Sequence, residues 1–184
     1  MRCFFALPLP EEARSEIIRD LAPARGKFPG LRWIPEESIH ITLIFLGDLN
    51  QQEVNGCIDM LKAAAEVTGA FPLAMDRIGC FPPRGRPRVY VAHVSRGAEP
   101  CIRIHDFLKE NLPAAGMAAA VSADLRPYAP HCTIARVRND VALPGLEELG
   151  RPAWNTVIGR CVLYESVLRP SGPEYREIAE VRFR

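Results

Sequence analysis

Apolar runs, interrupted by prolines and glycines, divide the chain into predicted strands and helices. Runs rich in β-branched and aromatic residues indicate strands over residues 2–7, 39–46, 71–81, 88–95, 131–137, 155–168 and 174–183. Apolar residues at helical spacing indicate helices over residues 11–21, 50–69 and 99–115. This irregular alternation favours an α+β fold with antiparallel sheets over a doubly wound parallel fold.

Local residue chemistry sets several boundaries. Asn50 is a suitable N-cap for the second helix, and Pro170-Ser171-Gly172-Pro173 is typical of a hairpin turn between the last two strands. Residues 139–153 are interpreted as a loop or a short helix. The alanine-rich segment 114–123 fits either a helix end or a loop.

Two of the predicted strands carry the same polar pattern inside an apolar run. One contains His40-Ile41-Thr42-Leu43 and the other contains His131-Cys132-Thr133-Ile134. Residues i and i+2 of a strand point to the same face, so each imidazole emerges beside a hydroxyl. The order of strand, helix, extended lead-in and histidine strand occurs twice. We therefore expect two half-chain units that each supply one histidine to a shared cleft.

Length and charge limit the partners. The 184 residues suit one bilobal domain that spans residues 1–184. With 23 Lys and Arg against 22 Asp and Glu, tight binding to long nucleic acid by counterion release is not implied. Only three of the basic residues are lysines, and guanidinium groups suit phosphate, although a general arginine bias explains the total more simply.

Cysteine usage and missing motifs narrow the class further. The six cysteines are scattered, with no Cys-x-x-Cys pair and no secretory signal, which favours a reducing, cytoplasmic setting. No apolar run reaches the ~18 residues of a membrane span. Neither a glycine-rich nucleotide-binding motif nor histidine and cysteine spacing typical of zinc occurs.

Two histidines in one cleft can act as a paired acid and base. Histidine titrates at about pH 6.5 when unperturbed, so one imidazole can be neutral while the other carries a proton. One can accept a proton from water while its partner gives a proton to a leaving oxygen, and the threonine hydroxyls can donate to phosphoryl oxygens. Each acid–base role is worth about 10²–10⁴ in rate, which suits a strained ester such as a five-membered cyclic phosphodiester.

These residues resemble a known family, and the resemblance covers nearly the whole chain. The two motifs are similar to those of the 2H phosphoesterases, specifically the LigT-like RNA 2′,3′-cyclic phosphodiesterases. Further matching stretches are Phe4-Phe5-Ala6, Arg32-Trp33-Ile34-Pro35, Arg86-Pro87-Arg88-Val89 and Leu163-Tyr164-Glu165-Ser166. The resemblance implies a bilobal α+β fold with two pseudo-symmetric lobes around a central cleft. It also implies a monomer that needs no cofactor or metal. The implied reaction opens 2′,3′-cyclic phosphates, at RNA ends or in small cyclic nucleotides, to 2′-phosphates.

The resemblance also implies roles for single residues. His40 matches the proton donor to the departing 3′ oxygen, and His131 matches the base that activates water. The residues that match phosphate-binding or nucleotide-binding positions of the family are Thr42, Thr133, Arg136 and Phe5. From the residues alone, the two histidines could exchange roles, and Phe5 could equally be an ordinary core residue.

Some positions depart from the family's pattern or stay open. Ala129 and Glu165 stand where many relatives carry arginine, so contacts with RNA beyond the terminal nucleotide are expected to be weaker or rearranged. Cys132 points away from its neighbouring histidine and is expected in the core. The histidines without a threonine at i+2, His93 and His105, are interpreted as structural. The basic cluster of Arg84, Arg86 and Arg88 either borders the cleft or lies in a solvated loop.

Two other functions are open at this point. A site that cleaves a bond also lowers the barrier to making it, so the same residues could join RNA ends through a 2′–5′ bond. The cleft could also hold a mononucleotide without turnover, although binding alone does not require two titrating groups.

Overall fold

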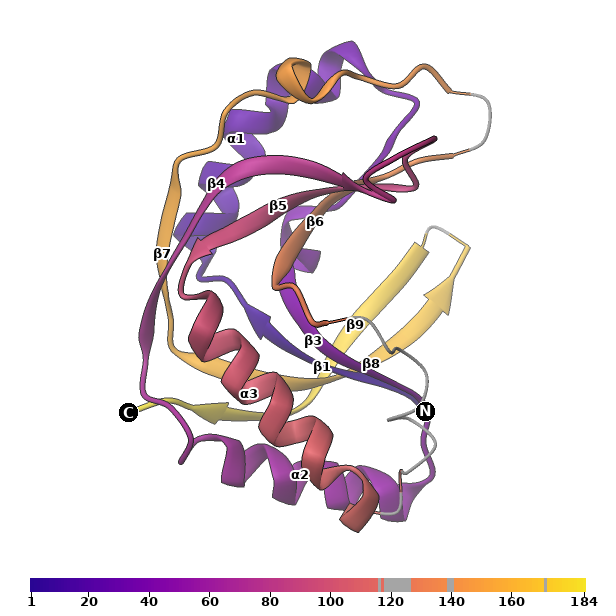
Figure 1. Ribbon diagram of the computed structural model, residues 1–184. Coiled ribbons are helices and arrows are strands. Elements are labelled where there is room, and N and C mark those ends of the chain that lie inside the picture. Colours follow the sequence, from indigo (N-terminus) through magenta and orange to yellow (C-terminus); the bar gives the residue numbers. More distant parts are fainter. Residues whose placement is uncertain (116, 118–126, 139–140, 171) are drawn as a thin grey trace.

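The fold is a curled antiparallel sheet with helices packed against both of its halves (Figure 1). The computed structural model describes residues 1–115, 117, 127–138, 141–170 and 172–184. In chain order, the elements are β1 (Arg2–Pro8), α1 (Glu11–Lys27), β2 (Arg32–Trp33), η1 (Glu36–Ser38), β3 (His40–Asp48), α2 (Gln51–Ala64), β4 (Phe71–Phe81), β5 (Val89–Arg96), α3 (Ala98–Asn111), η2 (Pro113–Ala115), β6 (His131–Arg136), η3 (Leu146–Leu149), β7 (Trp154–Ile158), β8 (Arg160–Arg169) and β9 (Gly172–Arg182). The η elements are short 3-10 helices.

The strands lie in the order β7-β4-β5-β6-β3-β1-β8-β9, and β2 pairs with the end of β6. The two histidine strands, β3 and β6, are neighbours at the centre, where they share a single register pair between Ile41 and Cys132. The sheet divides there into a lobe that contains β3 and a lobe that contains β6. The predicted α+β fold with antiparallel strands is confirmed.

The lobes do not coincide with the two halves of the chain, so the expectation of two half-chain units is wrong. β1 and β3 share their lobe with β8 and β9 from the C-terminal end. β1 is buried on both faces, and it pairs with β3 along one edge and with β8 along the other. A buried strand must satisfy its backbone N–H and C=O groups on both edges, and the C-terminal strands provide the second partner.

Two helices also cross between the lobes. α1 follows β1 but packs against β7, where Trp154 Nε1 donates to Asp20 Oδ2 at 2.9 Å. α3 follows β5 but packs against β3 and α2 (Figure 1). The chain thus crosses between the lobes twice in the same way. Each time, a strand of one lobe is followed by a helix that packs on the other lobe and then by a histidine strand.

Local signals explain most of the element boundaries. The Asn50 side chain accepts from the backbone N–H of Glu53 at 3.0 Å, and the Glu53 carboxylate accepts from the backbone N–H of Asn50 at 2.7 Å, so α2 begins with a capping box. The strand predicted over 155–168 is instead two strands, β7 and β8, because the chain turns at Gly159. β8 and β9 form the predicted hairpin. Most of the segment 114–123 lies outside the described residues.

The core fills the space between the sheet and its helices. Cys132 is fully buried in it, and burial raises the pKa of the Cys132 thiol to about 12, so this residue is a core residue as predicted. Within the described part of the chain, no helix combines the length and apolar character needed to cross a membrane.

Candidate active site

The register of β3 and β6 brings the two His-x-Thr motifs together. The paired residues Ile41 and Cys132 are the middle residues of the motifs. In an antiparallel pair, the residues on either side lie across from each other, so each histidine faces the threonine of the other strand. Four polar side chains therefore share one face and line one cleft of about 640 Å³: His40, Thr42, His131 and Thr133.

Backbone carbonyls fix the orientation of both imidazoles in the same way. His40 Nδ1 donates to the Ser38 carbonyl oxygen at 2.8 Å, and His131 Nδ1 donates to the Ala129 carbonyl oxygen at 2.7 Å. A carbonyl can only accept, so the proton of each neutral ring is on Nδ1. The Nε2 atom is then left as an acceptor, and His40 Nε2 lies 3.0 Å from Thr42 Oγ1.

The surroundings keep both histidines neutral in the ligand-free protein. Burial is the largest cause that lowers the pKa of His40 to about 4; the positive charges of Arg136 and of protonated His131 act in the same direction, and the hydrogen bond to the Ser38 carbonyl opposes them. Burial also lowers the pKa of His131, again with a contribution from Arg136. Arg136 lines the cleft. An anionic ligand bound there would therefore offset the effect of the Arg136 charge on the pKa of both histidines.

An aromatic ring stands edge-on to each histidine. Tyr175 of β9 is T-shaped to His40, with ring centroids 5.4 Å apart, and Phe81 of β4 is T-shaped to His131 at 5.1 Å. The ring of Phe4 covers a further side of His40 at 5.2 Å. These rings exclude water from the imidazoles, which is the physical cause of the lowered pKa values.

Phe5 does not lie in the cleft, which corrects its expected place beside a nucleotide. The side chain is fully buried on the opposite face of β1, within the main core. Phe4 occupies the cleft face because Ala6, two residues further along β1, is paired with Thr42. The sequence pattern gives no register between strands and so could not distinguish the two phenylalanines.

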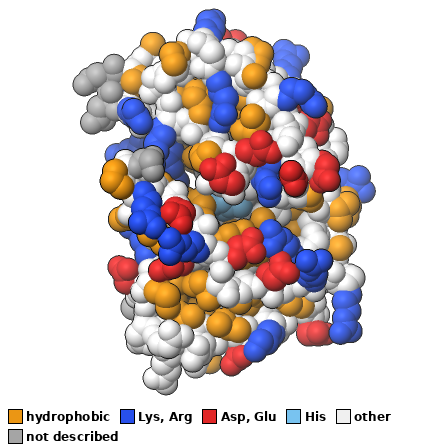
Figure 2. Space-filling model, turned by 180° about the vertical axis from the view of Figure 1, so that it is seen from behind, with side chains coloured by type: hydrophobic (Ala, Val, Ile, Leu, Met, Phe, Trp, Pro, Cys, Tyr) orange, Lys and Arg blue, Asp and Glu red, His pale blue; other side chains and the backbone are white. Residues whose placement is uncertain are grey.

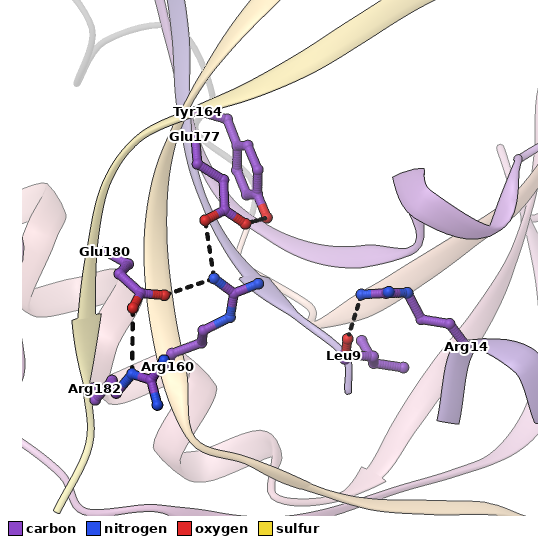
Figure 3. A network of polar contacts seen from close by, with 7 residues as sticks. All are labelled: Leu9, Arg14, Arg160, Tyr164, Glu177, Glu180 and Arg182. Carbon is purple, nitrogen blue, oxygen red and sulfur yellow. Dashed lines mark hydrogen bonds and ion pairs between the residues drawn. The ribbon is translucent and has the colours of Figure 1, made fainter. Parts of the chain in front are cut away.

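A polar network joins the side chains of β8 and β9 (Figure 3). Tyr164 stacks on Phe4 with ring centroids 5.2 Å apart, and its hydroxyl donates to Glu177 Oε1 at 3.3 Å. Arg160 Nη1 donates to Glu177 Oε2 at 3.0 Å and to Glu180 Oε2 at 2.7 Å. These contacts hold β8 and β9 together beneath the ring that covers His40.

Tyr128 links the two histidine strands, and sequence reasoning did not single it out. Its hydroxyl donates to the Thr42 carbonyl oxygen at 2.9 Å, and His105 stacks on its ring at 4.2 Å. His105 thus has a structural contact, as predicted, and it also lies at the margin of the cleft. The other predicted structural histidine, His93, packs edge-on against Phe81 at 5.9 Å.

The basic loop and the candidate metal ligands lie outside this constellation. Arg86 Nη2 donates to the Val141 carbonyl oxygen at 3.4 Å, and the backbone of Arg88 pairs with Phe81 and Val137. None of the three loop arginines lines the cleft. Across the described ranges, no three His, Cys, Asp or Glu residues gather in a group that could hold a metal ion.

Comparison with known proteins assigns this geometry to a class. The family model described as the 2′-5′ RNA ligase superfamily matches residues 9–167. An RNA 2′,3′-cyclic phosphodiesterase of Geobacillus stearothermophilus is 34% identical over 179 residues, which are 96% of this chain and 55% of that protein. One of Thermotoga maritima is 29% identical over 188 residues and is covered to 96%. The chain thus spans about half of the first relative and nearly all of the second.

Solved structures share the fold. The crystal structure of TT0787 of Thermus thermophilus has a TM-score of 0.88 and 27% identity, with 100% of this chain and 98% of that chain covered. Escherichia coli LigT in complex with 3′-AMP has a TM-score of 0.76 and 23% identity, with 99% and 97% covered. The curled sheet and its paired His-x-Thr strands define an enzyme of the 2H phosphoesterase class. The chain belongs to the 2′-5′ RNA ligase superfamily.

Proposed function

We propose that this protein hydrolyses 2′,3′-cyclic phosphates at RNA ends, or in small cyclic nucleotides, to 2′-phosphates without a metal ion. One observation carries the proposal: two imidazoles with the same tautomer direct Nε2 into one cleft, each facing a threonine of the other strand. The names of the Geobacillus and Thermotoga relatives and the 3′-AMP bound to LigT support this class of substrate.

In the proposed reaction, His131 acts as the base and His40 as the acid. Water gives a proton to His131 Nε2 and forms a bond to phosphorus. The bond between phosphorus and the 3′ oxygen breaks, and that oxygen takes a proton from His40 Nε2. The hydroxyls of Thr42 and Thr133 and the Arg136 guanidinium stabilise the charge on the non-bridging oxygens. A 2′-phosphate and a free 3′ hydroxyl remain.

The negative charge of the substrate favours the protonated His40 that this reaction needs. Since burial holds both histidines neutral in the free protein, His40 must gain a proton when the substrate binds. The negative phosphoryl group favours the protonated imidazole and offsets the effect of Arg136. Before the next turnover, His131 must release the proton that it took from water, and His40 must gain a proton from the solvent.

Product analysis tests the proposal. The protein is incubated with 2′,3′-cyclic AMP and with a short RNA that ends in a cyclic phosphate, in excess EDTA, and the phosphate position is determined by ³¹P NMR. We expect a 2′-phosphate at the rate seen without EDTA. A 3′-phosphate, or a rate abolished by EDTA and restored by a divalent cation, would contradict the proposal. Tight AMP binding with no turnover would indicate a binding module instead.

The joining of RNA ends is a second candidate, favoured by the name of the matching superfamily. The same acid and base can run the reaction in reverse, with a 5′ hydroxyl in place of water. A cyclic-phosphate RNA mixed with a 5′-hydroxyl RNA should then yield a 2′–5′ junction that resists a 3′–5′ specific nuclease. If only the hydrolysed end accumulates at high RNA concentration, this candidate is excluded.

We also propose a cellular compartment and an oligomeric state for this protein. All six cysteines are free thiols, and five are buried, which suits a reducing, cytoplasmic compartment. The cleft is formed within one chain, which is compatible with a monomer, and sedimentation at micromolar concentration tests this.

A further inference from the structure

Arg32 of β2 lies beside Arg136, the last of the cleft residues on β6. In the register of β2 and β6, Arg32 is paired with Arg136. Paired residues of an antiparallel ladder direct their side chains to the same face, and Arg136 lines the cleft. Arg32 therefore starts from the wall of the cleft that carries His131 and Thr133, further from the histidines than Arg136.

The guanidinium of Arg32 reaches the opposite wall. It packs on Gly172, where a Cβ atom would overlap Nη2 and lie 3.1 Å from Cζ. Gly172 begins β9, the strand that places Tyr175 against His40. Gly172 has a φ of 134°, a conformation that favours glycine, so the hairpin approaches Arg32 at a residue with no side chain. Arg32 thus bridges the two lobes beside Arg136, just outside the residues that line the cleft itself.

This end of the cleft has two arginines, Arg32 and Arg136, whose Cα atoms are partners in the β2–β6 ladder. The charge of Arg136 is near enough to lower the pKa of both histidines. Within the described ranges, no carboxylate forms an ion pair with Arg32 or Arg136. Figure 2 shows both Lys or Arg and Asp or Glu side chains around the hollow in which a histidine is visible. Two forked guanidiniums suit an anion that carries more than one phosphate.

We propose that Arg32, together with Arg136, binds the phosphodiester on the 5′ side of the terminal nucleotide, so that the cleft selects an RNA chain over a cyclic mononucleotide. Arg136 lies about 10 Å along β6 from Thr133, and Arg32 lies about 5 Å to the side of Arg136, on the neighbouring strand β2. The cyclic phosphate occupies the position between the histidines, so Arg32 is placed for the next phosphate. This inference rests on the proposed function.

Substrates of increasing length test the assignment. The ratio of kcat/KM for a cyclic-phosphate dinucleotide to kcat/KM for 2′,3′-cyclic AMP is measured for the native chain, Arg32→Ala, Arg32→Gln and Arg32→Lys. One charge-assisted hydrogen bond corresponds to roughly 10- to 100-fold in this ratio, so both neutral variants should lower it by that factor. Arg32→Lys should fall in between, because it keeps the charge and loses the fork. The salt dependence of binding to the dinucleotide should fall by ~0.7 in log–log slope.

A charge-matched control and a second variant sharpen the result. Arg19→Ala removes an exposed arginine of α1, which lies 3.7 Å from Asp20, and should leave the ratio as in the native chain. Gly172→Ala should lower the ratio as Arg32→Ala does, because the new methyl group displaces the guanidinium.

Two outcomes would overturn the assignment while the proposed function stands: no preference of the native chain for the dinucleotide, or an unchanged ratio in Arg32→Ala and Arg32→Gln. An unchanged ratio that comes from equal losses on both substrates would mean that Arg32 only holds the β8–β9 hairpin in place. Failure of the proposed function itself is distinguishable, since the native chain would then hydrolyse neither substrate.

Discussion

The lowered pKa values of the two histidines determine how the proposed reaction should depend on pH. The reactive form carries one proton on the pair, and burial makes that form abundant only below the ordinary histidine value of about 6.5. We expect a bell-shaped profile of kcat/KM with its maximum below pH 6.5. The profile of kcat should lie at higher pH, because the bound phosphate raises both pKa values. Stopped assays in constant ionic strength buffers give both profiles, and a kcat/KM maximum above pH 7 would contradict this expectation.

Phe4 and Phe5 should differ in their effect on His40, although they are adjacent and both buried. The ring of Phe4 covers His40 at 5.2 Å, whereas Phe5 lies on the core face. Phe4→Leu should admit water and raise the pKa of His40 from about 4 toward its ordinary value, as measured by NMR titration of the imidazole. Phe5→Leu serves as the matched control, with lower stability and an unchanged His40 titration. Equal shifts in the two variants would show that Phe4 is not the shield.

The two histidines and the two threonines could be placed together from the sequence because their spacing alone fixes a shared face. Arg136 was expected at the phosphate only from the family resemblance, because by spacing alone a residue three positions after Thr133 falls on the opposite face of a regular strand. A register shift in the β5–β6 pairing, between Tyr90 and Val91, leaves Ile134 unmatched and returns Arg136 to the cleft. Such irregularities depend on the partner strand and leave no signal in the local sequence.

At the scale of elements, the capping box at the start of α2 makes a quantitative prediction. Asn50→Ala removes the acceptor for the backbone N–H of Glu53 and should lower the free energy of unfolding by about 1 kcal/mol. Gln52→Ala, in the same turn, should change it by less than about 0.5 kcal/mol. Urea unfolding followed by circular dichroism measures both values. Equal effects of the two substitutions would mean that the cap contributes no specific stability.

Strong periodicity made the helices and most strands predictable. The break between β7 and β8 and the contacts between distant segments depend on the tertiary fold. The pattern over 155–168 is continuous in apolar character, yet the chain changes strand at Gly159, so β7 and β8 lie at distant places in the sheet. The link from Tyr128 to Thr42 joins two segments far apart in the chain. Hydrogen bonds of this kind hold the histidine strands in register, and they follow from the tertiary fold rather than from any local pattern.

At the scale of the whole molecule, the sequence indicated the fold class and the number of lobes but not their composition. The duplicated order of elements suggested a division at the middle of the chain. In the structure, the C-terminal hairpin joins the N-terminal strand, and α1 and α3 each pack on the other lobe. The cleft therefore lies between lobes that share chain segments, which ties the position of each histidine to both ends of the chain.

In the proposed reaction, two histidines of one cleft act together as acid and base. The most direct measurement is the turnover of 2′,3′-cyclic AMP in EDTA by His40→Ala, His131→Ala and the double variant, with Arg19→Ala on the exposed side of α1 as a control outside the cleft and circular dichroism as a check of folding. We expect each single variant to lose about 10²–10⁴ in kcat and the double variant to lose little more, because the two groups act in one step. Arg19→Ala should stay within a few-fold of the native chain. A folded His40→Ala or His131→Ala variant with native turnover would contradict the account.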